Sequence, residues 1–144
     1  MASVTVRGGA ALRQEIDVRG RTLVADEPAE LGGQDEGPTP YELLLGALGA
    51  CTAMTVTMYA QRKGWPLQGV TVELESDRVH ASDCAECETR AGYLDRIHLR
   101  IAVDGPLHED QRLRLEEIAR RCPVRKTLMS EVQIEDELRL SAYQ

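Results

Sequence analysis

The sequence predicts an α+β fold with antiparallel sheets, and three features of the chain lead to that prediction. Short β-type runs open the chain, one long apolar helix follows, and strands of alternating apolar and polar residues flank a second, amphipathic helix. Grouped strands with helices between them, rather than a regular strand–helix repeat, are typical of this class. The 144 residues fit a single domain, 1–144.

The first group of strands is predicted from three short runs of β-branched and aliphatic residues. Breaks at Gly8-Gly9 and Arg19-Gly20 separate the runs, which contain Val4 and Val6, then Ile16 and Val18, then Leu23 and Val24. The stretch 25–40 is rich in Pro and Gly and is predicted to be a loop. A small N-terminal sheet is therefore expected, followed by a long connection.

The long helix is predicted over residues 41–63. Thr39 is its expected N-cap, Pro40 can be its first residue, and Gly64 ends it. Segment 43–60 carries no charge, and its length reaches the lower edge of a membrane span. We favour a buried core helix instead, because the segment contains Thr and Gly and no second span accompanies it. One small chain can hardly surround such a helix, so we expect a homodimer and no membrane partner.

The C-terminal half is predicted to alternate strands and helices. We expect strands at 69–75 and 94–103 joined by a polar hairpin loop over 76–92, a helix over 107–122, a short helix over 124–129 and a final strand over 132–140. The helix 107–122 has its core stripe at Leu115, Ile118, Ala119 and Cys122, and Pro123 ends it.

The charge and the cysteines narrow the function. A net charge of -7 repels phosphate backbones, so no nucleic acid partner is expected. The N-terminus lacks the pattern of a signal peptide, which predicts a cytoplasmic location. Disulfides in the cytosol are usually transient and catalytic, so the four cysteines are candidates for reactive or metal-binding residues rather than for a structural disulfide framework.

Two of these cysteines lie on predicted helices. By position alone, Cys51 is more typical of a small core residue, because the helix dipole is weak three turns into a helix. A reactive Cys51 needs a cation from elsewhere, and arginine is best suited to that task. Cys122 stands where one helix ends and another begins, and N–H groups at a helix start stabilise a thiolate. Its alternative role is to complete the core stripe.

The other two cysteines form a C-x-x-C, Cys84 and Cys87, in the predicted loop. This spacing suits zinc binding or a redox pair. Zinc needs two more ligands, and His80 is the only candidate nearby, while the acidic neighbours disfavour reactive thiols. We predict no metal site and no cofactor, and a plain loop role is the favoured interpretation.

Two long motifs resemble the OsmC/Ohr family. The stretch DEPAELGG-QDE-GPTPYELLLGALGACTAMTVTMYAQRKGWPL is similar to that family's first cysteine region, and CPVRKTL is similar to its second. The resemblance runs from about residue 16 onward, and the DCAECET and GWPL segments are closest to the OsmC-like branch. It implies antiparallel sheets around a long buried central helix in an intertwined homodimer, with the active sites at the subunit interface.

The resemblance also implies a thiol peroxidase active in oxidative stress defence. Cys51 would attack an organic hydroperoxide, and possible substrates include hydrogen peroxide. Cys122 would resolve the resulting sulfenic acid as a disulfide, and a dithiol reductant would restore both thiols.

One part of the family pattern departs in this chain. The family pairs an arginine with a glutamate beside the reactive thiolate, and the glutamate position holds Tyr41 here. Glu42 follows, but it falls roughly opposite Cys51 on a straight helix. For the arginine we select Arg21 as the substrate-binding residue, with Arg19, Arg13 and Arg7 as alternatives.

Two other functions compete with this one. The same scaffold could bind a small ligand without catalysis, which the loss of the glutamate favours. A zinc module at Cys84 and Cys87 is the third hypothesis.

Overall fold

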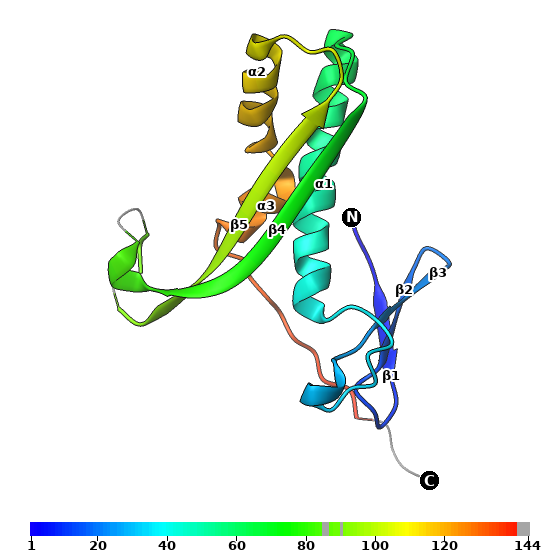
Figure 1. Ribbon diagram of the computed structural model, residues 1–144. Coiled ribbons are helices and arrows are strands. Elements are labelled where there is room, and N and C mark those ends of the chain that lie inside the picture. Colours follow the sequence, from blue (N-terminus) through cyan, green and yellow to red (C-terminus); the bar gives the residue numbers. More distant parts are fainter. Residues whose placement is uncertain (85–86, 90, 141–144) are drawn as a thin grey trace.

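The computed structural model describes residues 1–84, 87–89 and 91–140, and its elements form an α+β arrangement (Figure 1). The N-terminal sheet has three antiparallel strands in the order β1 (Thr5–Gly8), β2 (Gln14–Val18) and β3 (Arg21–Ala25). The predicted breaks lie in the two turns of this sheet, and Arg19 and Gly20 both have positive φ. This part of the prediction is confirmed.

A structured loop joins this sheet to the long helix. It contains the short 3-10 helix η1 (Ala29–Leu31) and wraps around the buried Asp26. The carboxylate of Asp26 accepts hydrogen bonds from the backbone N–H groups of Glu27, Gln34 and Glu36. Burial opposes ionisation, but these bonds and the nearby Arg13 hold the pKa of Asp26 below its usual value. Asp26 thereby organises the loop that delivers the chain to the helix.

Helix α1 (Pro40–Lys63) has both of the predicted ends. The Thr39 hydroxyl accepts a hydrogen bond from the N–H of Glu42, and the Glu42 carboxylate accepts one from the N–H of Thr39. This capping box fixes the first turn. Gly64 ends the helix in the left-handed conformation, with φ of 68°. The helix is bounded at both ends by local chemistry.

The second sheet is a two-stranded antiparallel ribbon of β4 (Gly69–His80) and β5 (Tyr93–Asp104), which crosses α1 diagonally (Figure 1). Alternate residues of β5 turn inward, and the ribbon packs against α1 through β4. The approach is close, because a Cβ atom at Gly49 would lie 2.7 Å from the side chain of Leu74. The predicted strand 69–75 was too short, since regular pairing continues to His80 before the 3-10 helix η2 (Ala81–Asp83).

This extension of β4 is held by polar groups, which explains why it reads as a loop in the sequence. Asp77 pairs with Arg96, and Arg78 pairs with Asp95, across the two strands. Opposite charges facing each other stabilise antiparallel strands even where no core lies beneath them.

Helix α2 (Glu109–Ala119) packs on α1, and α3 (Pro123–Leu128) follows after a short bend. The predicted helix 107–122 was therefore too long. Its core stripe is correct, since Leu115, Ile118, Ala119 and Cys122 are all buried. Leu107, Leu115 and Ala119 form the main core with Val56 and Ala60 of α1.

The predicted strand 132–140 is wrong for this structure. Residues 131–140 have no regular structure and are exposed, with Ile134, Leu138 and Leu140 each at least 78% exposed. A strand needs a neighbour to receive its hydrogen bonds, and this segment has none within the described part of the chain. The alternating apolar and polar residues of this segment therefore do not form a strand here.

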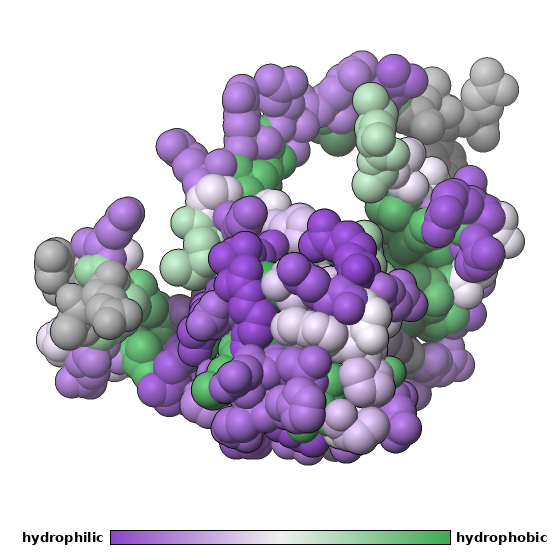
Figure 2. All heavy atoms as spheres, turned by 90° about the horizontal axis from the view of Figure 1, so that it is seen from above, coloured by the Kyte–Doolittle hydropathy of each residue, from purple (hydrophilic) through white to green (hydrophobic). Residues whose placement is uncertain are grey.

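Helix α1 is only partly covered in the single chain. Its buried stripe is Leu48, Gly49, Thr52, Val56 and Ala60, whereas the large apolar residues Tyr41, Leu44, Met54 and Met58 are exposed by 38–64%. By length and composition, α1 is also the one helix among the described residues that could cross a membrane, a test that core helices pass too. The space-filling view shows an open gap through the molecule, with hydrophobic residues along parts of its inner edge (Figure 2).

Candidate functional site

The structure brings Cys51 and Cys122 together where α1 meets α3. Cys51 lies in the middle of α1, and Cys122 is the N-cap residue of α3. Their thiol groups are within hydrogen-bonding reach of each other. Pro123, the first residue of α3, gives up no helical hydrogen bond at that position, so the chain can turn sharply after Cys122. Two sulfurs far apart in the sequence thus share one small site.

The two thiols differ in exposure. Cys51 is half-buried, whereas Cys122 is completely buried, with 0% of its surface exposed. A molecule arriving from solvent can therefore meet Cys51 but not Cys122. This division of access is the main geometric property of the pair.

The two thiols also differ in their tendency to ionise. Burial and the hydrogen bond with Cys122 raise the pKa of Cys51, and the N–H of Val124 and the hydroxyl of Thr55 oppose this only in part. For Cys122, burial acts against ionisation, but several hydrogen bonds outweigh it and lower the pKa. They come from Cys51, the N–H of Arg125, the hydroxyl of Thr52 and the N–H of Val124. In the single chain Cys122 is therefore the more readily ionised of the two thiols.

Two of these groups, the hydroxyls of Thr52 and Thr55, were not foreseen from the sequence. Thr52 and Thr55 follow Cys51 by one and four residues, so their positions on the helix were predictable, but the contact of Thr52 with Cys122 crosses between helices. The backbone N–H groups of α3 were partly foreseen, because a cysteine at a helix start predicts a stabilised thiolate.

Glu42 and Tyr41 do not supply a carboxylate near the thiols. The Glu42 side chain is used in the capping box of α1. Tyr41 is 64% exposed and lines a groove instead. Among the described residues, no other acidic group is placed at the family's glutamate position, so this departure stands.

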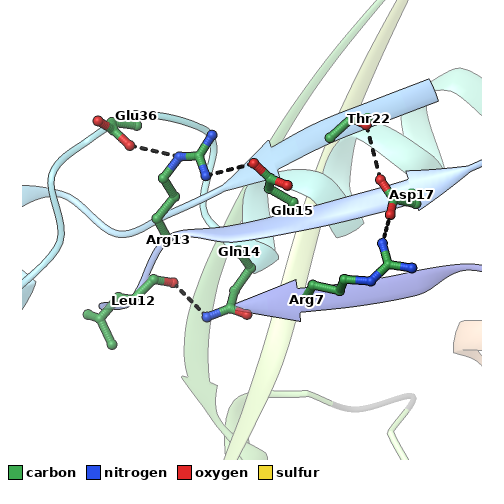
Figure 3. Close-up of polar contacts among 8 residues, drawn as sticks. All are labelled: Arg7, Leu12, Arg13, Gln14, Glu15, Asp17, Thr22 and Glu36. Carbon is green, nitrogen blue, oxygen red and sulfur yellow. Dashed lines mark hydrogen bonds and ion pairs between the residues drawn. The ribbon is translucent and has the colours of Figure 1, made fainter. Parts of the chain in front are cut away.

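The N-terminal arginines lie on the three-stranded sheet, away from the α1–α3 junction (Figure 1). Arg13 pairs with Glu15 and Glu36, and Arg7 pairs with Asp17 (Figure 3). Both are therefore committed to neighbouring carboxylates.

Two candidates remain: Arg19 lies in the turn between β2 and β3, and Arg21 opens β3. Both are exposed, and neither makes a salt bridge within the described part of the chain. The groups that act on Cys51 within one chain come from α1 and α3, and Arg21 is not one of them. Its role at Cys51 stays a prediction.

Cys84 and Cys87 form a disulfide at the tip of the β4–β5 hairpin. In this state neither sulfur is a thiolate that could bind zinc. No group of three or more His, Cys, Asp or Glu residues in the described ranges is arranged to hold a metal ion. Residues 85 and 86, between the two cysteines, lie outside those ranges.

A groove of about 970 Å³ is lined by residues of α1, β5, α2 and α3, and neither Cys51 nor Cys122 is among them. Leu48 and Arg125 line it, and each is three residues, or about one helical turn, from a thiol-bearing residue. The rest of the wall comes from β5 and α2 and is mostly apolar with a few charges, including Ile97, Leu99, Ile101, Leu113, Arg112 and Arg120. Such a lining suits an apolar molecule with a polar end.

Comparison with known proteins bears on the family and the fold of the chain. The family model described as OsmC-like protein matches residues 33–137. A search of curated protein sequences finds no significant match.

Several solved structures resemble the chain. An OsmC-like protein from Mycoplasma pneumoniae has a TM-score of 0.70 at 19% identity, covering 90% of this chain and 87% of that one. The organic hydroperoxide resistance protein OsmC from Legionella pneumophila has a TM-score of 0.63 at 20% identity, covering 89% and 88%. The organic hydroperoxide resistance protein OhrB of Bacillus subtilis has a TM-score of 0.59 at 20% identity, covering 88% and 89%. At these identities the likeness shows a shared fold.

Proposed function

The chain belongs to the OsmC-like family, and on that premise we propose that it is a cysteine-based peroxidase that reduces organic hydroperoxides in oxidative stress defence. The observation that carries the proposal is the contact between an accessible Cys51 and a buried Cys122. The accessible Cys51 sulfur can react with the substrate, and the buried Cys122 sulfur can react with the oxidised Cys51 that results.

In the first step, Cys51 acts as the nucleophile. The shared proton moves from Cys51 to Cys122, which leaves the charge on the exposed sulfur. The Cys51 thiolate attacks the terminal oxygen of the hydroperoxide, and the O–O bond breaks. The alkoxide takes a proton from water and leaves as an alcohol, and Cys51 becomes a sulfenic acid.

In the second step, Cys122 resolves the sulfenic acid. Its sulfur attacks the Cys51 sulfur, the S–O bond breaks, and the leaving hydroxide takes the proton that Cys122 received in the first step and departs as water. A dithiol reductant then attacks the disulfide, becomes a disulfide itself and returns both cysteines to thiols. The pair needs only a small movement for this, because each thiol already lies close enough to shift the pKa of the other.

Arg21 has its place in this proposal as a residue supplied by a second copy of the chain. The exposed apolar face of α1 and the unpaired segment 131–140 both leave surface that a homodimer would cover. An arginine beside Cys51 would offset the burial that now raises its pKa and would hold a peroxide oxygen. Such a dimer would act in the cytoplasm, where dithiol reductants are available.

Substituting the thiols tests the function. Peroxide consumption is measured with cumene hydroperoxide and a dithiol, in wild type, in Cys51→Ser and in a Cys84→Ser/Cys87→Ser double variant. The proposal expects activity to be lost in the first variant and kept in the second. Equal, slow consumption by wild type and Cys51→Ser would refute it.

A non-catalytic ligand-binding role on the same scaffold is the second candidate. The mostly apolar groove over α1, β5 and α2 favours it, as does the tyrosine at position 41, which lines that groove. If Cys51 in the assembled protein keeps a raised pKa and reacts with no hydroperoxide, while the groove binds an apolar acid, this role replaces the enzymatic one.

A further inference from the structure

The ring of Tyr59 lies where α1 packs beside α2 (Figure 1), and cationic side chains gather around it. The guanidinium carbon of Arg62, the ammonium nitrogen of Lys63 and the guanidinium carbon of Arg114 lie 5.6, 5.7 and 5.5 Å from the ring centroid. Arg62 and Lys63 end α1, whereas Arg114 comes from α2. The Trp65 ring packs edge-on against Tyr59, with 5.5 Å between the two centroids. Two helices thus bring three positive charges to one aromatic ring.

Only one carboxylate is paired with these cations. Arg114 forms a salt bridge of 2.8 Å with Glu117, whereas Arg62 and Lys63 form none with any residue that the structure describes. The whole chain has a net charge of -7, so the excess of positive charge is local. The dipole of α1 favours cations in its last turn, which accounts for Arg62 and Lys63. It does not account for Arg114, which lies in the middle of α2.

The phenol of Tyr59 has an unused hydrogen-bond donor. Its oxygen accepts a hydrogen bond of 3.1 Å from Nε of Arg114, and no residue in the described ranges accepts the hydrogen of the hydroxyl itself. The bond from Arg114 lowers the pKa of Tyr59, burial opposes this, and the charges of Arg114, Lys63 and Arg121 lower it further. A more acidic phenol is a stronger donor, so the hydroxyl is suited to bind an anion among these cations.

We propose that Tyr59, Arg62, Lys63 and Arg114 form a binding site for a phosphate group, either the free ion or the end of a phosphate ester. Arg114 has five N–H groups, of which Tyr59 and Glu117 each occupy one, so three remain for a ligand. A phosphate group carries up to two negative charges and at least three acceptor oxygens at pH 7. A carboxylate has one charge and two oxygens, so it matches the excess of positive charge less well.

This site is separate from the thiol pair. Tyr59 follows Cys51 by eight residues on α1, which is about 12 Å along the helix axis. The proposal therefore does not depend on the peroxidase function, and its test requires no peroxide. Loss of phosphate binding would leave the proposed peroxidase chemistry untouched, and loss of peroxidase activity would leave this site untouched.

The test measures binding of inorganic phosphate to the full chain by isothermal titration calorimetry, in a phosphate-free buffer at constant ionic strength. Trp65 is the one tryptophan of the chain and contacts Tyr59, so its fluorescence should change over the same range of phosphate concentration. Acetate should bind at least about tenfold more weakly than phosphate, because it has fewer charges and fewer acceptors. Glycerol 3-phosphate identifies the source of the ligand: tighter binding than inorganic phosphate assigns the site to an ester, and weaker binding assigns it to the free ion.

Three variants locate the binding. Arg114→Met removes a charged donor and should weaken phosphate binding at least about tenfold. Tyr59→Phe keeps the ring and its cations but removes the hydroxyl, and should weaken binding about fivefold. Arg78→Met is the matched control, because it removes the same charge from an exposed residue of β4 and should leave binding unchanged. If Arg114→Met does not fold, the double variant Arg62→Met/Lys63→Met, at the exposed end of α1, takes its place.

Three results overturn the proposal. A wild-type protein that binds no phosphate, or binds it with no change in Trp65 fluorescence, has no phosphate site at Tyr59. Equal binding of acetate and phosphate means that the group does not select a phosphate. An equal loss of affinity in Arg114→Met and Arg78→Met means that phosphate is attracted by surface charge in general, which salt would screen, and not by the groups around Tyr59.

Discussion

Oxidation of the thiol pair should make the protein markedly harder to unfold. A disulfide between Cys51 and Cys122 closes a loop of about 70 residues, and the chain-entropy relation assigns such a loop about 4 kcal/mol of stabilisation. Loss of the thiol hydrogen bond in the folded state subtracts about 1 kcal/mol. The net gain of about 3 kcal/mol corresponds to a rise in Tm of about 10 °C for a chain of 144 residues.

The measurement is urea unfolding of the reduced protein and of protein treated with one equivalent of cumene hydroperoxide. Both samples are held at one protein concentration, because an oligomer's apparent stability depends on it. The midpoint should rise and the slope should fall, since a cross-linked unfolded chain exposes less surface. Cys122→Ser is the control, because it cannot form the bridge and should show no rise.

An oxidised protein with an unchanged or lower midpoint would refute the reasoning. That result would mean that the two sulfurs do not join without distorting α1 or α3. The Cys84–Cys87 disulfide closes a much shorter loop, and running both samples in the Cys84→Ser/Cys87→Ser background removes it from the comparison.

Three further predictions concern other described residues. Leu115→Ala should cost about 3 kcal/mol of unfolding free energy, because this core side chain is 1% exposed, whereas Leu113→Ala on the same helix, at 52% exposed, should cost under about 1 kcal/mol in urea unfolding. Asp26 is easier to ionise in the folded than in the unfolded chain, so its carboxylate stabilises the fold above the unfolded carboxyl pKa, and this stability is lost as pH falls through the depressed folded pKa. Asp26→Asn should therefore lower the free energy of unfolding at neutral pH but not at low pH. Acid titration followed by circular dichroism should show wild type and variant converging at low pH, and parallel curves would contradict this. The hydrogen bond from Arg114 lowers the pKa of Tyr59, so Arg114→Met should move the phenol titration at 295 nm to higher pH, and a titration left in place would count against that contact.

Much of the fold could be predicted because it is set by local chemistry. The ends of α1 follow from Thr39 and Gly64, and the core stripe of α2 follows from its spacing. The failures involve partners distant in the sequence. The extension of β4 depends on Arg96 across the ribbon. Segment 132–140 has the pattern of a strand, but it has no neighbouring strand among the residues that the structure describes.

In the candidate site, too, the features set by local sequence could be predicted, and those set by contacts between distant segments could not. The resemblance alone predicted that Cys51 and Cys122 lie close together, because local sequence patterns do not predict the distance between two helices. That the helix start would stabilise Cys122 as a thiolate followed from its position, and the lowered direction of its pKa agrees with this. The contact of Thr52 could not be predicted, because it depends on how closely α3 approaches α1.

The capping box and Gly64 fix the residues at which α1 begins and ends. These ends determine the direction, around the helix axis, in which the Cys51 side chain points. One residue inserted between Thr39 and Cys51 would swing the sulfur by about 100° around the helix axis, away from Cys122, although the helix itself would still form. Insertion of four residues would nearly restore the direction but displace the sulfur by about 6 Å along the axis. The direction in which the Cys51 sulfur points therefore depends on the number of residues between it and Thr39, twelve positions earlier.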